Sequence, residues 1–376
     1  MTSLSIGDDD DAGLVRYTHL HWVDRRQSHL TGSILGTAIG DSIGLPYEGL
    51  SRCRAIKLLG LPNRHRLLFG FGMVSDDTEH TCIVVRSLIA SGGDVAKFQN
   101  QLAWQLRFWL LGLPAGIGFA TLRSILKLWL GVPPDQSGVF SAGNGPAMRS
   151  AILGIAIEDV NQLREVVRIN TRITHTDPKA EYGAFAIALA AHHACQVAST
   201  SGDSGDNFLI QLKSYLGRDA EPFIALISQT VDSVKEGEST LQFAAKLGLS
   251  RGVSGYVYHS VPIAIHACLS HPQDYREAIM TTVQCGGDTD SMAAMVGGIV
   301  GASVGKEGIP KEWLSRLLEP TYSVKWMESL SKQLDLSLQT GIADQPIQLP
   351  ILGLGRNLLF LVIVVSHGFR RLLPPY

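Results

Sequence analysis

The sequence has little charge and little cysteine, and each shortage argues against a class of protein. Asp, Glu, Lys and Arg together make up 18% of the 376 residues, and the formal net charge is −2. General nucleic-acid binders need basic patches, whereas the Lys and Arg residues here are scattered. The five cysteines include no CxxC pair, which disfavours a disulfide framework and a zinc ribbon. We therefore expect no nucleic-acid partner and a reducing, cytoplasmic location.

Strand-like alternation and an apolar N-terminal signal segment are also lacking. Apolar residues make up 45% of the chain, enough for a sizeable core. Asp177-Pro178 and His271-Pro272 each predict a helix start, because a proline suits the first turn of a helix. Apolar residues recur at three- and four-residue spacing in residues 94–111, 158–171, 179–197, 208–216 and 254–269. This pattern predicts an all-α fold with a single compact multi-helix domain.

The chain divides by composition into three parts. Residues 1–27 form a polar leader, residues 28–338 the helical domain, and residues 339–376 a C-terminal extension with an apolar helix. The apolar octet 358–365 is too short to span a bilayer, so we expect no transmembrane span. The favoured interpretation is a terminal helix docked on the core; the alternative is a helix that lies on a membrane surface.

Glycine recurs every four residues in two places, at 32, 36, 40 and 44 and, after Ala293, at 297, 301 and 305. This spacing puts each set on one helical face. Glycine in a helix costs up to about 1 kcal/mol relative to alanine, so such a stripe needs a reason. We expect the two helices to pack closely at the centre of the domain, with the acidic residues at their ends on one rim.

Two acidic motifs adjoin these segments: Ser75-Asp76-Asp77-Thr78 and Asp288-Thr289-Asp290-Ser291. Each could simply begin a helix. Asp76 followed by Glu79 resembles a capping box, and Asp288 or Asp290 could cap the next helix. Each motif nevertheless carries two acids where one would cap. The motifs therefore suggest a shared metal site if the fold brings them together.

Four clustered carboxylates would repel one another unless a cation lay between them. An all-oxygen donor set suits Mg²⁺ or Mn²⁺, whereas zinc would require His or Cys. His80 is adjacent to the first motif, but its side chain points elsewhere on a helix than those of Asp76 and Asp77. We interpret His80 as a structural or rim histidine.

A third motif, Ser141-Ala142-Gly143-Asn144-Gly145, precedes a predicted helix. Glycines around an Asn offer free backbone N–H groups, which suit a pyrophosphate. The alternative is a plain helix-entry turn. Phe140 would supply an aromatic face for a base. His175 stands just before another helix start, which by itself is a weak signal.

Taken in order, these pieces resemble the ADP-ribosylglycohydrolases. The resemblance covers roughly residues 30–320 and rests on Gly40-Asp41-Ser42-Ile43-Gly44 with Glu48, Ser75-Asp76-Asp77-Thr78, Gly143-Asn144-Gly145-Pro146-Ala147-Met148-Arg149, Thr174-His175 and Gly286-Gly287-Asp288-Thr289-Asp290-Ser291. It implies an all-α fold of that type with a two-metal centre of Mg²⁺ or Mn²⁺. The stretch 99–138 matches none of the motifs.

The resemblance also implies roles for particular residues. The metal ligands would be Ser75, Asp76, Asp77, Asp288, Asp290 and Ser291. The residues along the ADP-ribose cleft would be Ser141, Gly143, Asn144, Gly145 and His175. Glu48 would be a mobile acid near the metals, and Asp77 or Asp290 would accept a proton from water.

The implied reaction is hydrolysis of an ADP-ribosyl N- or O-glycosidic bond on a modified protein or a small adduct. Two alternatives stay open at this point. One is a non-catalytic ADP-ribose-binding relative, and the other is a metal hydrolase acting on a phosphoester.

Overall fold

The computed structural model describes residues 9–196, 204–344 and 350–372. These ranges contain α-helices and short 3₁₀-helices with no β-strand, which confirms the all-α prediction. The α-helices are α1 (Asp9–Gly44), α2 (Arg52–Leu59), α3 (Asp76–Ser91), α4 (Val95–Leu111), α5 (Phe119–Trp129), α6 (Gly145–Met148), α7 (Ala151–Ala156), α8 (Val160–Arg172), α9 (Pro178–Gln196), α10 (Ser204–Tyr215), α11 (Glu221–Lys235), α12 (Thr240–Lys246), α13 (Val257–Ser270), α14 (Tyr275–Val283), α15 (Thr289–Gly308), α16 (Lys311–Ser315), α17 (Val324–Thr340) and α18 (Pro350–Leu372).

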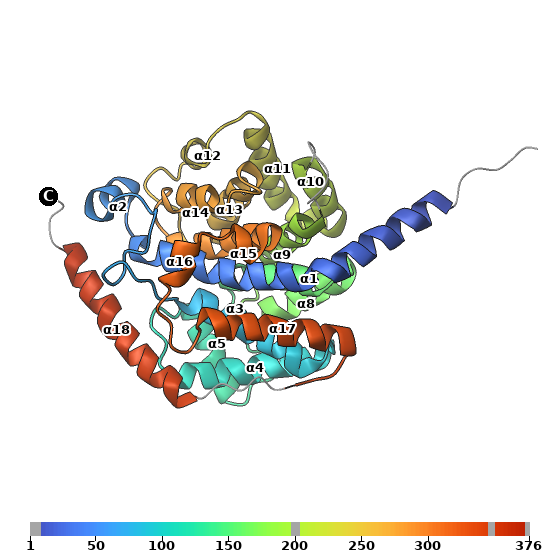
Figure 1. Ribbon diagram of the computed structural model, residues 1–376, viewed down its shortest axis with the longest axis horizontal. Helices are drawn as coiled ribbons and strands as arrows, with labels where there is room; N and C mark the ends of the chain where they lie inside the picture. The colour runs from blue at the N-terminus through green and yellow to red at the C-terminus, as the bar shows by residue number, and fades with distance from the viewer. Residues whose placement is uncertain (1–8, 197–203, 345–349, 373–376) are drawn as a thin grey trace, which may run out of the picture.

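The centre of the molecule is the pair α1 and α15, which lie side by side with the other helices around them (Figure 1). A methyl group on Gly36 would clash with the carbonyl oxygen of Gly297, and one on Gly40 with that of Ala293. The glycine stripes therefore face each other, as predicted, and let the two backbones touch. Gly305 also lies against Gly32, although its φ of 67° interrupts the regular helix there.

One of the two helix starts predicted from a proline is confirmed. Asp177 accepts a hydrogen bond from the N–H of Lys179 at 2.9 Å, and α9 begins at Pro178. The prediction at His271-Pro272 is wrong. His271 follows the last residue of α13, and α14 begins only at Tyr275, where the carboxylate of Asp274 caps it. A proline alone did not mark the true start.

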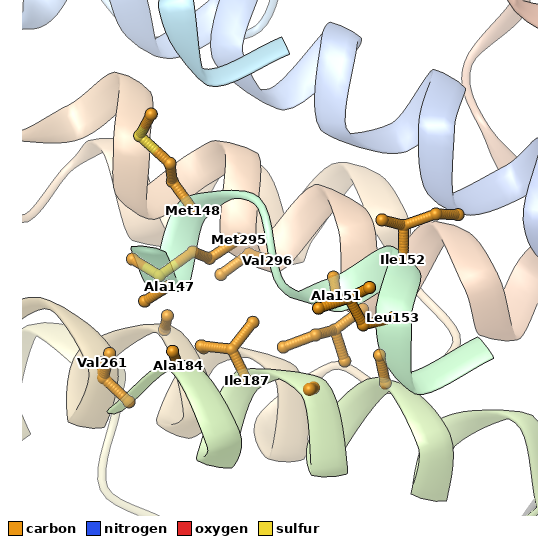
Figure 2. Close-up of a cluster of buried hydrophobic side chains, with 14 of the residues drawn as sticks. Ala147, Met148, Ala151, Ile152, Leu153, Ala184, Ile187, Val261, Met295 and Val296 are labelled. Atoms are coloured by element: carbon orange, nitrogen blue, oxygen red, sulfur yellow. The ribbon is translucent and has the colours of Figure 1, made fainter. Parts of the chain in front are cut away.

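A buried apolar layer supports one wall of the cleft described below. In Figure 2, Ala147 from α6 and Ile187 from α9 point into the same interior as Met295 from α15, whereas Met148 leaves α6 on the opposite side. Because these side chains are buried, the short helix α6 is fixed against the central pair, and the turn before it is fixed with it.

The two ends of the chain are helical where they are described. Residues 9–27 belong to α1. The terminal helix α18 contacts the body through Arg356 and Asn357, and contact of its exposed apolar residues with a membrane surface stays a prediction. No helix in the described ranges is long and apolar enough to cross a membrane.

Candidate metal centre and cleft

The first acidic motif opens α3, but the capping residue is Ser75 and not Asp76. The Ser75 hydroxyl accepts the N–H of Asp77 at 3.2 Å. The prediction of a capping box is wrong, because Glu79 turns away and pairs with Arg356 at 2.6 Å. The carboxylate of Asp76 is left to point into a cleft.

Asp41 on α1 holds this turn in place. Its Oδ2 atom accepts hydrogen bonds from the N–H of Ser75 at 2.9 Å, from the N–H of Thr78 at 3.2 Å and from the Thr78 hydroxyl at 2.5 Å. No role was predicted for Asp41, which was named only as part of a motif. Its place next to Gly40 in the glycine-rich segment is the local signal that points to it.

The second motif opens α15 in a similar way. Asp288 occupies the residue before the helix without making a side-chain cap. Its Oδ2 atom instead accepts a hydrogen bond from the amide of Asn144 at 2.6 Å. The hydroxyl of Ser291 lies 3.4 Å from Oδ2 of Asp77. This contact joins the two motifs, which are 214 positions apart in the sequence.

All twelve residues that the sequence analysis selected line one cleft of about 580 Å³. They are Glu48, Ser75, Asp76, Asp77, Ser141, Gly143, Asn144, Gly145, His175, Asp288, Asp290 and Ser291. The fold thus brings together every residue of the predicted set. Their individual roles stay predictions.

Crowding of carboxylates gives the cleft its electrostatic character. Burial raises the pKa of Asp77 well above its usual value, and the carboxylates of Asp41, Asp76 and Asp288 raise it further. Burial also raises the pKa values of Asp76 and Asp290 well above normal, and that of Asp41 to about 7. Negative charge in this cleft is therefore unfavourable without a counter-charge.

The donor set fits a hard divalent cation, although the side chains are not already arranged around one. In the described ranges, no three His, Cys, Asp or Glu side chains stand in a geometry that could hold a metal ion. The Oδ1 atoms of Asp41 and Asp77 are nevertheless buried without a hydrogen-bond partner. Buried orphan oxygens of this kind call for a ligand, and oxygen donors suit Mg²⁺ or Mn²⁺.

A buried chain of hydrogen bonds fixes His175 at the cleft. Arg149 donates to the Thr174 hydroxyl at 2.9 Å, and that hydroxyl lies 2.9 Å from Nδ1 of His175. The Thr174 hydroxyl also lies 3.4 Å from the carbonyl oxygen of Thr171, so its hydrogen has two acceptors within reach, and Nε2 of His175 is a donor or an acceptor at the cleft according to the tautomer. Burial, and then the charge of Arg149, lower the pKa of His175 to about 3. The ring is therefore neutral. His80 also binds Arg149, at 2.9 Å, which supports its structural interpretation.

The turn before α6 differs from its predicted form. Its backbone N–H groups are already partly used: that of Gly143 donates to the Ser141 hydroxyl at 3.3 Å, and that of Asn144 to the carbonyl of Gly255 at 2.9 Å. The turn therefore contributes fewer free donors than expected. Phe140 is 81% exposed and does not line the cleft, whereas Phe119 does.

Several residues lining the cleft escaped the sequence analysis. The segment 115–121, which comprises a loop and the first turn of α5, lies inside the stretch that matched no motif, and Ser254 and Gly255 precede α13. The terminal helix α18 contributes Phe360 and Val364. None of these carries a charged or glycine-rich signature strong enough to stand out alone.

Comparison with known proteins agrees with this geometry. Residues 23–343 match the family model for ADP-ribosylglycohydrolase. The chain belongs to the ADP-ribosylglycohydrolase family. An uncharacterised protein of Archaeoglobus fulgidus is 32% identical over 293 residues, which are 76% of this chain and 90% of that protein.

Two named relatives are more distant. The ADP-ribosyl-[dinitrogen reductase] glycohydrolase of Rhodospirillum rubrum is 26% identical, covering 76% of this chain and 89% of its own length. Mouse ADP-ribosylhydrolase ARH3 is 25% identical, covering 77% and 87%. A solved structure titled as an ADP-ribosylglycohydrolase-related protein complex aligns with a TM-score of 0.60 at 26% identity, covering 84% of this chain and 99% of that one. The family match includes all twelve predicted residues and ends before α18.

Proposed function

We propose that this member of the ADP-ribosylglycohydrolase family hydrolyses an ADP-ribosyl N- or O-glycosidic bond and releases ADP-ribose, with dependence on Mg²⁺ or Mn²⁺. The observation that carries the proposal is the meeting of the two acidic motifs in one cleft, joined by Ser291 and Asp77. The same cleft holds the neutral ring of His175. The names of the relatives support this substrate class.

The reaction needs charge stabilisation at the anomeric carbon of the ribose, which becomes oxocarbenium-like. Divalent cations held by Ser75, Asp76, Asp77, Asp288, Asp290 and Ser291 would supply positive charge for the ribose hydroxyls and for an attacking water.

The protein's own groups carry the proton transfers. Asp290, whose pKa burial raises well above normal, accepts a proton from the attacking water; Asp77 is placed to do the same. Glu48, at the exposed edge of the cleft, assists departure of the acceptor. The water oxygen bonds to the anomeric carbon, the bond from that carbon to the acceptor breaks, and the acceptor leaves with a proton from Glu48.

The remote parts of the substrate would be held along the turn. His175 Nε2 faces Gly143 across this part of the cleft, and in the tautomer that carries the proton on Nε2 it donates to a phosphate or ribose oxygen. Remote contacts of this kind position the reacting centre.

The test is release of free ADP-ribose from arginine-linked and serine-linked ADP-ribosylated proteins, with Mg²⁺ or Mn²⁺ and again with EDTA. We expect metal-dependent release from one linkage. Binding of ADP-ribose without release from any adduct would favour a non-catalytic relative, and turnover of a generic phosphodiester without inhibition by ADP-ribose would favour a phosphoesterase.

A further inference from the structure

The C-terminal helix α18 lies outside the part of the chain that matches the family, yet it forms part of the candidate active site. The family match ends at residue 343, and α18 begins at Pro350. Phe360 and Val364 nevertheless line the same cleft as the acidic motifs. This chain therefore has a cleft wall that the family match does not include.

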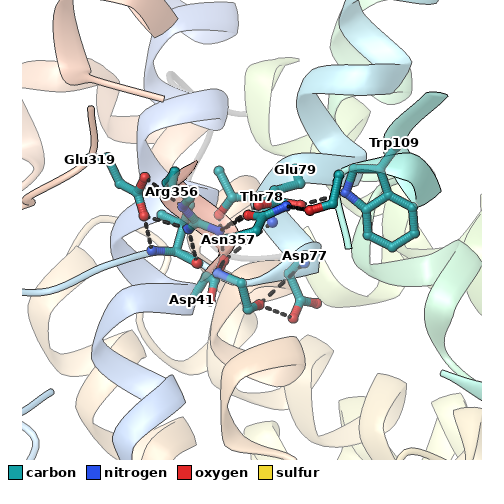
Figure 3. Close-up of polar contacts among 11 residues, drawn as sticks. Asp41, Asp77, Thr78, Glu79, Trp109, Glu319, Arg356 and Asn357 are labelled. Atoms are coloured by element: carbon teal, nitrogen blue, oxygen red, sulfur yellow. Dashed lines mark hydrogen bonds and ion pairs between the residues drawn. The ribbon is translucent and has the colours of Figure 1, made fainter. Parts of the chain in front are cut away.

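An internal ion pair anchors this helix. Arg356 is buried and donates to Glu79 at 2.6 Å and to Glu319 at 2.5 Å (Figure 3). Glu79 is on α3, one turn after Asp76. The neighbouring Asn357 donates to the carbonyl of Gly112 at 2.8 Å. Since these partners belong to three separate segments, the N-terminal half of α18 has a defined position beside the cleft.

The anchor also fixes the side chain that faces the cleft. The guanidinium carbon of Arg356 lies 4.5 Å from the centre of the Phe360 ring, a favourable cation–π arrangement. Phe360 is 2% exposed and packs in a small cluster with Leu45, Leu67 and Met73. This cluster is separate from the main core.

The acidic motifs lie between α18 and the glycine-rich turn. On one side, Asp288 is bound by Asn144 of the turn at 2.6 Å. On the other, a methyl group placed on Gly116 would be 3.9 Å from Oδ1 of Asp76, and Ala115 next to it packs against the cluster that holds Phe360. The cleft therefore has a polar end at the turn and an apolar end at α18.

The two ends of the cleft therefore suit the two halves of a substrate. If the ADP-ribosyl group lies along the turn with its ribose at the acids, as the proposed function requires, the bond that breaks points toward α18. The acceptor would then lie against Phe360 and Val364.

We propose that α18 forms the acceptor side of the cleft, and that Phe360 and Val364 select adducts whose acceptor is slender. Such acceptors are a free small molecule or an extended peptide chain, in contrast to the surface of a folded protein. The inference rests on the proposed function and names the substrate class for that same site.

The experiment compares one linkage in two settings. ADP-ribose is attached to a folded protein and, through the same linkage, to the free amino acid, and kcat/KM is measured for each. In Phe360→Ala the ratio of protein adduct to free adduct should rise about tenfold, the range expected when a few methylene groups leave a pocket wall. Val364→Phe should lower the same ratio. Affinity for free ADP-ribose should stay within about twofold in both, since that product lacks the acceptor.

Leu361→Ala is the matched control, because Leu361 is on the same helix but 44% exposed; its ratio should equal that of the unaltered chain. Val364→Phe keeps the test informative if Phe360→Ala fails to fold. An unchanged ratio in both variants would overturn the inference, as would a loss of ADP-ribose affinity equal to the change in kcat/KM. A complete lack of ADP-ribose release by the unaltered chain, from every adduct, would instead overturn the proposed function.

Discussion

Two groups of buried acids lie within one turn of each other on α3, and they differ in how their charge is balanced. Glu79 is held by Arg356 and by the indole N–H of Trp109 at 2.5 Å. Asp76 and Asp77, at the start of the same helix, form no ion pair with a lysine or arginine of the described chain. Arg356 balances the charge of Glu79, whereas no ion pair in the described part of the chain balances the charges of Asp76 and Asp77.

The difference separates an acid whose charge is balanced within the protein from acids whose charge is not. Burial raises the pKa of Glu79, but Arg356 and the indole of Trp109 oppose that rise, so the charge of Glu79 is balanced within the protein. At the cleft, burial and neighbouring carboxylates all raise the pKa of Asp77. A folded chain tolerates such a cluster when an external ligand completes it.

The largest expected effect comes from removing an acid at the cleft. Asp290→Ala removes a carboxylate that would hold a cation and accept a proton, so kcat/KM for ADP-ribose release should fall about 1,000-fold, or about 4 kcal/mol. Metal binding, measured by calorimetry, should weaken together with activity. Glu181→Gln is the control, since that acid pairs with Arg172 away from the cleft. Normal turnover by Asp290→Ala would refute the metal assignment.

The next effect tests the group whose charge is balanced within the protein. Arg356→Met leaves Glu79 and Glu319 buried without a counter-charge, so the free energy of unfolding should fall by about 3 kcal/mol. Adding Glu79→Gln and Glu319→Gln should restore part of the loss. Arg172→Met breaks a pair whose arginine side chain is 51% exposed, and should cost less than about 1 kcal/mol. Urea unfolding gives both values; equal losses would remove the distinction between the two groups.

The same comparison shows what the sequence could predict. The acids at 76, 77, 288 and 290 stood out because they were clustered in a chain with little charge. The glycine stripes stood out because four-residue spacing in a helix has a steric reason, and the contact of α1 with α15 confirms it. Both signals are local repeats, which a single sequence displays directly.

The pairing of Arg356 with Glu79 was not predictable in the same way. The two residues are 277 positions apart, and nothing next to Arg356 in the sequence indicates its partner. Glu79, in turn, was read as a helix cap because its partner was unknown. Long-range ion pairs depend on tertiary contacts that no local pattern encodes. The place of segment 115–121 in the cleft could not be predicted for the same reason.

A third prediction uses pH to measure the repulsion at the cleft. Asp41 has a pKa raised to about 7, and those of Asp76, Asp77 and Asp290 are raised as well. Without metal, the folded chain binds more protons than the unfolded chain between about pH 4 and pH 7. Protonation of these acids therefore stabilises the folded chain at low pH, and that stabilisation is lost as pH rises through the window. A bound cation offsets the loss.

Saturating Mg²⁺ or Mn²⁺ should therefore stabilise the protein more at pH 8 than at pH 5. The gain at pH 8 should reach about 2.7 kcal/mol when the cation is at 100 times its Kd. Thermal unfolding with the cation and with EDTA measures the difference. The buried histidines, such as His175, titrate equally in both samples and cancel. An equal shift at the two pH values would show that the acids do not hold the cation.

The smallest expected effect is the difference in stability loss between two substituted acids at helix starts. Asp94 caps α4 by accepting the N–H of Lys97 at 2.8 Å, so Asp94→Ala should cost about 1 kcal/mol of stability. Asp288 precedes α15 without capping it. In EDTA at pH 8, the free energy of unfolding of the Asp288→Asn variant should stay within about 0.5 kcal/mol of that of the unaltered chain. The substitution removes a repelling charge and keeps an oxygen that accepts from Asn144. A loss as large as that of Asp94→Ala would mean that Asp288 supports the helix after all. A small loss combined with lost activity would show that its carboxylate is kept for the cleft.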